Sequence, residues 1–138
     1  MRSPLAALGA AGIALGAVLI WAPDAAADPG DHVYVDHVEW AKWGDLSSLR
    51  VYPTDAARAL THQPGSAAQA DQAWAEVLSL SPDADLPGMR EQFLCHWTFA
   101  ELAEPGKTSW NLEPWRPEVA PEVMLASGCN PGGSEEPF

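Results

Sequence analysis

Basic residues are scarce in this sequence. Seven Lys and Arg stand against 19 Asp and Glu in 138 residues, which gives a formal net charge of −12. A nucleic-acid binder needs a basic surface to neutralise phosphates, and electrostatic docking on anionic lipid also needs positive charge. The charge balance therefore argues against both classes of partner. The length suits one domain rather than two.

Motifs of the common catalytic and cofactor sites are absent as well. The chain has no glycine-rich phosphate loop, no His-Glu-x-x-His, no Gly-x-Ser-x-Gly and no Cys-x-x-Cys. We therefore expect no cofactor. The repeated pairs Asp31-His32 and Asp36-His37 suggest metal ligands, but a spacing of five places the two histidines on opposite faces of a strand. We favour a solvated, acidic strand edge and expect no metal.

The first 27 residues have the three-part layout of a secretory signal peptide. Arg2 precedes an unbroken run of apolar or small residues over 5–22, Pro23 breaks that run, and alanines 25–27 provide a signal-peptidase site. We expect cleavage after residue 27, an exported mature chain of residues 28–138 and no stable membrane insertion. The alternative is an uncleaved anchor, since the run approaches the ~20 residues that span a bilayer.

Cysteine is limited to Cys95 and Cys129. In an exported chain a single pair predicts one intramolecular disulfide. Closing that loop would stabilise the fold by roughly 3.5–4 kcal/mol in the chain-entropy model. The alternative is a catalytic pair of Cys95 with the adjacent His96, but adjacency in sequence does not bring a base onto its nucleophile. We favour the structural disulfide.

Alternating β-branched and aromatic residues predict a β-hairpin at the start of the mature chain. Residues 32–43 form the first strand, Gly44-Asp45 and Ser47-Ser48 mark the turn, and residues 49–52 form the second strand before Pro53. Alternation assigns the first strand two faces, with Tyr34, Val38 and Trp40 on one and Val33, Val35, Ala41 and Trp43 on the other.

Helical signals follow the hairpin. A short helix begins at Thr54 or Asp55 and runs to Leu60, and a longer one begins at Ser66, whose spacing to Gln69 is that of a capping box. Pro82 ends the longer helix. Residues 89–100 are ambiguous between helix and strand, although the Met-Arg-Glu-Gln opening favours helix for the first half.

The C-terminal third contains short elements only. We predict a turn at residues 104–106, a short strand within 108–112, and one or two helical turns over 121–127 closed by Gly128. Strand signals followed by helical ones, without regular alternation, indicate an α+β fold. We therefore expect one small domain over residues 28–131, with a β-hairpin packed against two to four helices and one disulfide, and a flexible acidic tail over 132–138.

Residues 107–117 are unusual in composition. They hold two tryptophans, two prolines, two basic residues, one Asn and one Glu in eleven positions. Trp110 and Trp115 are candidates to flank a sugar ring or to stack on Arg116. The competing interpretation is that Glu113 and Arg116 form an ion pair that pins an irregular segment to the core. We favour the ion pair.

Three strings in the sequence resemble a known family. They are Gln-Phe-Leu-Cys-His at 92–96, Trp-Asn-Leu-Glu-Pro-Trp-Arg-Pro at 110–117 and Cys-Asn-Pro-Gly at 129–132, and the hairpin region is similar too. Together they resemble small secreted actinobacterial proteins of a domain-of-unknown-function family. The resemblance implies export and a single domain. It implies no catalytic residues.

Our leading functional hypothesis is a secreted binding module that engages an envelope glycan or another protein. The alternatives are a small hydrolase built from His96, Lys107, Glu113 and Arg116, or an exported inhibitor. The candidate ligand-binding or structural polar residues are His96, Lys107, Trp110, Asn111, Glu113, Trp115 and Arg116.

Any such site should lie beside the disulfide. The predicted bridge encloses residues 107–117 in a proline-stiffened loop, which preorganises side chains for a ligand or for packing. We expect the polar candidates of this loop to converge with His96 on one concavity. Within that set, His96 and Lys107 are the better functional candidates, because Glu113 and Arg116 are expected to pair.

Overall fold

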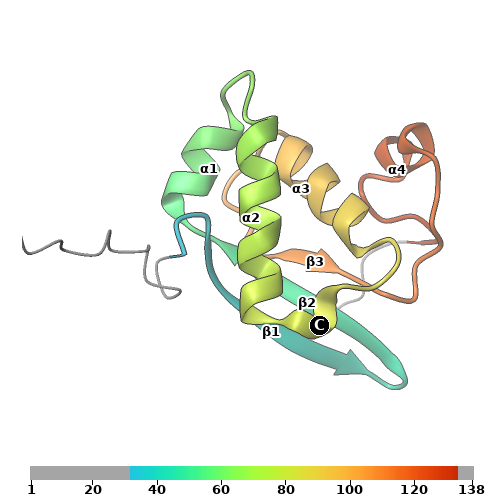
Figure 1. The fold of residues 1–138 in the computed structure, drawn as a ribbon. Helices are drawn as coiled ribbons and strands as arrows, with labels where there is room; N and C mark the ends of the chain where they lie inside the picture. The colour runs from blue at the N-terminus through green and yellow to red at the C-terminus, as the bar shows by residue number, and fades with distance from the viewer. Residues whose placement is uncertain (1–31, 134–138) are drawn as a thin grey trace, which may run out of the picture.

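Residues 32–133 are described by the computed structural model, so the expected signal peptide and residues 134–138 of the expected tail lie outside the described residues. The elements in chain order are β1 (Val35–Trp43), β2 (Leu46–Pro53), α1 (Asp55–Thr61), α2 (Ala67–Leu80), the 3₁₀ turn η1 (Pro82–Ala84), α3 (Met89–Ala103), β3 (Trp110–Leu112) and α4 (Pro121–Ala126) (Figure 1). This confirms the predicted small α+β domain with one disulfide, which joins Cys95 to Cys129.

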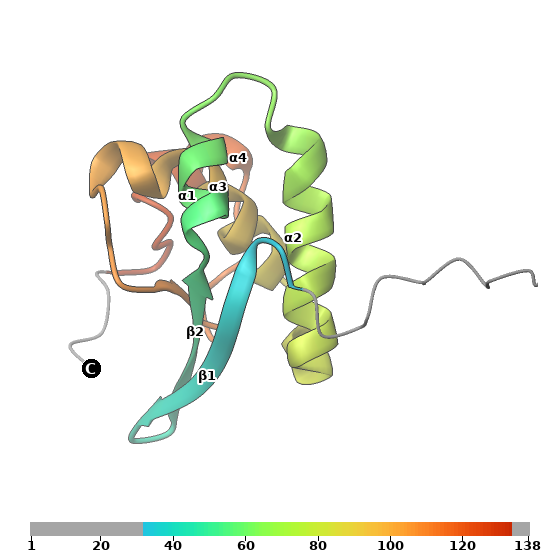
Figure 2. The same ribbon diagram turned by 90° about the vertical axis from the view of Figure 1, so that its left-hand side faces the viewer.

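The sheet is antiparallel with strand order β1–β2–β3. The hairpin turn is Gly44-Asp45, with Gly44 at φ +58°, a conformation that suits glycine in a two-residue loop. Strand β2 therefore begins at Leu46, and Ser47 and Ser48 belong to the strand rather than to the turn. The helices lie over one face of the sheet, and the hairpin tip extends beyond them (Figure 2).

The predicted side-chain alternation of β1 is wrong at its start. Val35 pairs with Pro53 whereas His37 pairs with Tyr52, so the register shifts by one residue at Asp36. A bulge of this kind interrupts the alternation of side chains between the two faces of a strand. As a result Val35 lies in the core, 1% exposed, and Tyr34 and Val38, which were predicted for the opposite face, pack against the same core.

The predicted capping box of α2 is also wrong. The Ser66 side chain makes no hydrogen bond to the first turn of the helix; its hydroxyl accepts one from the indole Nε1 of Trp97 at 3.2 Å. The Ser66 hydroxyl is therefore used in a tertiary contact with α3 and does not cap α2. The predicted start of α1 is confirmed, because Thr54 caps the helix: its hydroxyl accepts a hydrogen bond from the backbone N–H of Ala57 at 3.1 Å.

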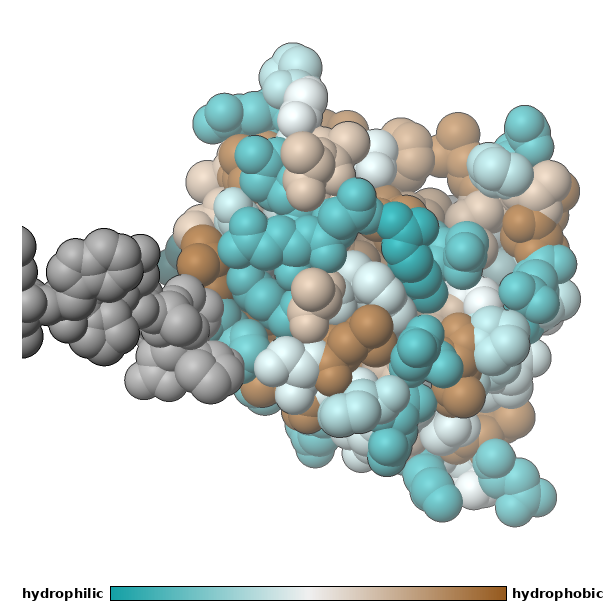
Figure 3. Space-filling model, viewed as in Figure 1, coloured by the Kyte–Doolittle hydropathy of each residue, from teal (hydrophilic) through white to brown (hydrophobic). Residues whose placement is uncertain are grey.

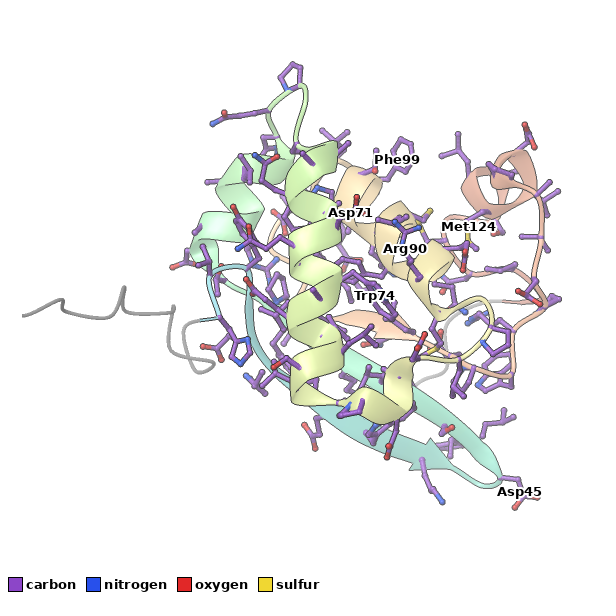
Figure 4. The ribbon with its side chains drawn as sticks, in the orientation of Figure 1. Asp45, Asp71, Trp74, Arg90, Phe99 and Met124 are labelled. Atoms are coloured by element: carbon purple, nitrogen blue, oxygen red, sulfur yellow. A yellow bond between two sulfur atoms is a disulfide. The ribbon has the colours of Figure 1, made fainter. Side chains whose placement is uncertain are left out.

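Residues 89–103 form one helix, α3, which resolves the ambiguity between helix and strand. Phe93, Trp97 and Ala100 recur at helical spacing and pack into the main core. The ring of Trp97 meets the ring of Trp110 edge-on, with centroids 6.2 Å apart. Trp74 of α2 points toward α3 and contacts Phe93 (Figure 4). Within residues 32–133 no helix is both long enough and apolar enough to cross a bilayer.

Candidate functional site

The carboxylate of Glu113 lies directly after β3 and is fully buried. The Ser48 hydroxyl of β2 donates to its Oε1 at 3.1 Å, and Arg116 Nε donates to its Oε2 at 2.9 Å. Both members of the Glu113–Arg116 pair are withdrawn from solvent. The structure therefore contains the Glu113–Arg116 ion pair, which the sequence analysis favours over a ligand site at these residues.

Gln92 of α3 holds the backbone of the same residue. Its Nε2 donates to the Glu113 carbonyl at 2.9 Å, and the Glu113 backbone N–H donates to its Oε1, also at 2.9 Å. Both groups of the Gln92 amide are thus used, and Gln92 is itself 1% exposed. This double contact fastens the end of β3 to α3.

Arg116 extends the same network toward the C-terminus. Its guanidinium donates to the carbonyls of Pro131 at 3.1 Å and Gly133 at 2.8 Å, and lies 4.5 Å from the ring centroid of Trp115. A Cβ at Gly132 would come within 2.8 Å of Pro117 Cδ, so the backbone after the disulfide packs closely against the 107–117 segment. The buried arginine consequently fixes the path of the chain after α4.

Trp110 and Asn111 are components of the sheet. Trp110 is 1% exposed and belongs to the main core, so it cannot flank a sugar ring. Asn111 pairs with Arg50 of β2 in the sheet register, and its Oδ1 accepts from the Ser109 hydroxyl at 2.7 Å. Trp115 is half-buried against Arg116. The tryptophans of this segment therefore do not form an open aromatic platform.

His96 and Lys107 line a common hollow of about 250 Å³, which we call the His96–Lys107 pocket. Its remaining walls come from the end of α3 and from the disulfide region: Phe99, Ala100, Ala103, Glu104, Gly128, Cys129 and Asn130. His96 Nδ1 lies 2.8 Å from the carbonyl of Gln92. A carbonyl only accepts, so Nδ1 carries a proton, and in the neutral ring Nε2 is the acceptor nitrogen. Lys107 Nζ lies 3.7 Å from the Glu104 carboxylate.

The polar candidates therefore do not converge on one concavity, as the sequence analysis expects, but lie in two separate places. His96 and Lys107 line the same pocket beside Cys129. Glu113 and Arg116 are instead buried against β2 and the C-terminal segment. Among residues 32–133, no group of three or more His, Cys, Asp or Glu side chains is placed to hold a metal ion.

A second hollow, of about 310 Å³, lies between α3 and α4, and we call it the α3–α4 groove. Its lining is almost entirely apolar: Leu94, Cys95, Phe99, Val119, Pro121, Met124 and Leu125, with Glu91 as the charged member. Phe99 from α3 and Met124 from α4 face this space (Figure 4). In the space-filling view, hydrophobic residues appear over α3 and α4 among hydrophilic ones (Figure 3).

Apart from Cys95, sequence reasoning missed the residues of the α3–α4 groove. The signal was present in α3, where Phe99 is apolar although it lies off the stripe formed by Phe93 and Trp97. Phe99 packs beside Met124 and the disulfide and not in the main core. An apolar residue outside the core stripe of a helix must be covered by another element or remain partly exposed. Helix α4 covers Phe99 only in part, since the side chain is still partly accessible.

Comparison with known proteins assigns the chain to a family. A family model described as "Protein of unknown function (DUF2599)" matches residues 35–132. The chain belongs to this family. The matched range contains both cysteines and both hollows, and the expectation of a domain-of-unknown-function family with actinobacterial members is confirmed.

The similar proteins are mycobacterial. An uncharacterized protein of Mycobacterium tuberculosis is 62% identical over 110 residues, which cover 80% of this chain and 74% of the relative. An uncharacterized protein of Mycobacterium leprae is 50% identical over 102 residues, covering 74% of this chain and 82% of the relative. No solved structure gives a significant match.

The buried ion pair yields a prediction for stability. Glu113→Ala leaves Arg116 buried without its carboxylate, and we expect a loss of about 3–5 kcal/mol in the free energy of unfolding, measured by urea denaturation. Asp71→Ala is the matched control, because it breaks the Asp71–Arg90 pair at the surface, which is worth about 0–1 kcal/mol. Equal stability losses in the two variants would contradict the structural role of Glu113.

Proposed function

We propose that this protein is an exported binding module whose binding surface is the α3–α4 groove. The proposal rests on an open, apolar hollow of about 310 Å³ in a strongly acidic chain. Ligand sites are typically concave, mainly apolar and about 300–1,000 Å³ in volume. An apolar concavity that stays open to solvent is typical of a surface that receives a ligand or a partner.

The hydrolase alternative is less well supported by the geometry. Catalysis by His96, Lys107, Glu113 and Arg116 requires these groups around one reacting centre. Glu113 and Arg116 are instead held by each other, by Ser48 and by backbone carbonyls away from the pocket. The Nδ1 proton of His96 is directed to a backbone carbonyl, where a catalytic histidine commonly has a carboxylate.

The tryptophans of residues 107–117 do not support an envelope glycan as the ligand. That idea required Trp110 and Trp115 to present open ring faces, and Trp110 lies in the core. The groove instead offers aliphatic, thioether and phenyl surface. Such surface recognises apolar groups, whether they belong to a small molecule or to a protein side chain. Among residues 32–133, no specific contact favours the inhibitor alternative.

The groove can be tested with an uncharged solvatochromic dye. We expect Nile red to bind the mature chain with enhanced, blue-shifted fluorescence, and Leu125→Glu to abolish this signal by placing a charge in the groove. Leu125 is 53% exposed, so the substitution leaves the core intact. Leu102→Glu is the matched control, because Leu102 is an exposed leucine of α3, 65% accessible, outside the groove.

Two results would overturn this proposal. One is the absence of any dye signal with the wild-type mature chain. The other is an equal loss of signal in Leu125→Glu and Leu102→Glu, since that would place the dye on general apolar surface and not in the groove.

Export, the other half of the proposal, rests on the apolar run after Arg2 and on the alanines at 25–27. The Cys95–Cys129 bridge is in keeping with it, because disulfides persist in oxidising compartments. We expect mass spectrometry of the protein recovered outside actinobacterial cells to give a mature N-terminus at Asp28. A chain that keeps Met1 and stays within the cytoplasm would contradict export.

A further inference from the structure

The α3–α4 groove has negative charge along its border. Glu91 of α3 is the charged residue that lines the groove, and Glu118 and Glu122 adjoin the lining residues Val119 and Pro121 in sequence. All three glutamates are exposed. An apolar group that enters the groove therefore passes close to carboxylates.

Glu91 is not neutralised by a base of the same chain. Among residues 32–133 its carboxylate has no cationic partner, and no Lys, Arg or His lines the groove. The neighbouring base, Arg90, is directed to α2, where its Nη2 lies 2.5 Å from Oδ1 of Asp71 (Figure 4). A cation brought by a ligand thus meets an uncompensated carboxylate. The net charge of −12 adds a long-range attraction for such a ligand.

The groove also matches one face of a short helix. Its α3 wall runs from Glu91 to Phe99, which is about 12 Å at the rise of an α-helix. Apolar anchors at positions i, i+3 or i+4, and i+7 of a bound helix span about 10 Å. Because the groove is open to solvent, one face of its occupant stays in water. An amphipathic helix has a polar face for that side, whereas a wholly apolar molecule does not.

We propose that the α3–α4 groove binds a basic amphipathic helix of a partner protein. The apolar side chains of that helix lie between α3 and α4, and its Lys or Arg side chains lie at Glu91 and the adjoining glutamates. Met124 in the groove suits this role, because a methionine side chain adapts to apolar partners of different shape. The inference rests on the proposed function, since it requires the groove to be the binding surface. A second copy of this acidic chain is a poorer occupant, because like charges repel.

The experiment uses three synthetic peptides of about 15 residues, a length at which a helix can form. The first has leucines at positions i, i+3, i+4 and i+7 and lysines elsewhere, the second has the same composition in shuffled order, and the third has glutamate in place of lysine. Each peptide carries a fluorophore and is titrated with the mature, disulfide-bonded protein, and fluorescence anisotropy gives its Kd. We expect the first peptide to bind about tenfold more tightly than the other two, and to gain helical circular dichroism on binding.

Two pairs of variants separate the charge from the apolar surface. Glu91→Gln should weaken the first peptide about threefold, the effect of losing one exposed ion pair. Asp45→Asn is its matched control, because it removes the same charge at the hairpin tip, away from the groove, and should leave the Kd unchanged (Figure 4). Leu125→Gln should weaken the peptide about tenfold by removing apolar surface from the groove. Leu102→Gln, at an exposed leucine of α3 outside the groove, should have no effect.

Three results would overturn the inference. Equal binding of the ordered and shuffled peptides, or equal weakening by Glu91→Gln and Asp45→Asn, would reduce the attraction to overall charge. Binding of decyltrimethylammonium without binding of any peptide would assign the groove to a small cationic molecule. A protein dimer in sedimentation equilibrium that Leu125→Gln dissociates would assign it to a second copy.

Nile red distinguishes failure of this inference from failure of the proposed function. If the dye binds in the groove and no peptide does, the basic helix is wrong while the apolar binding surface stands. If neither the dye nor any peptide binds, both proposals fail.

Discussion

Glu113 is buried between the sheet and α3, and its hydrogen bonds join three parts of the fold. Its side chain accepts hydrogen bonds from Ser48 of β2 and from Arg116, and its backbone is held by Gln92 of α3. One residue thus ties the sheet, the long helix and the irregular C-terminal segment together. A buried ion pair carries a large desolvation cost, which its own attraction offsets only when further hydrogen bonds complete the geometry. Here Arg116 completes it by donating to the carbonyls of Pro131 and Gly133.

This network and the disulfide explain why a groove exists. Helix α4 has only six residues, and a helix of that length is not stable without support from the rest of the fold. The Glu113–Arg116 network anchors the chain before and after α4, and the Cys95–Cys129 bridge ties its C-terminal side to α3. Because these anchors hold α4 in place, the two helices need not pack completely against each other. The apolar space that remains between them is the α3–α4 groove.

Much of the fold followed from local patterns, and the exceptions have identifiable causes. The hairpin, the first two helices and the disulfide were predictable because alternation, proline positions and cysteine count are local or compositional signals. The bulge at Asp36 and the use of the Ser66 hydroxyl by Trp97 were not, since both depend on partners distant in sequence. At the candidate site, composition marked residues 107–117 as unusual but did not locate the groove. Its walls come from residues 91–99 and 119–125, which only the tertiary fold brings together.

The proposed function requires apolar ligands to bind between α3 and α4. This can be measured by intermolecular nuclear Overhauser effects between bound Nile red and the mature protein, labelled with ¹³C at its Leu and Met methyl groups. We expect contacts from the dye protons to the methyl groups of Leu94, Met124 and Leu125, which line the groove. Contacts confined to exposed leucines outside the groove, such as Leu102 or Leu86, would contradict it.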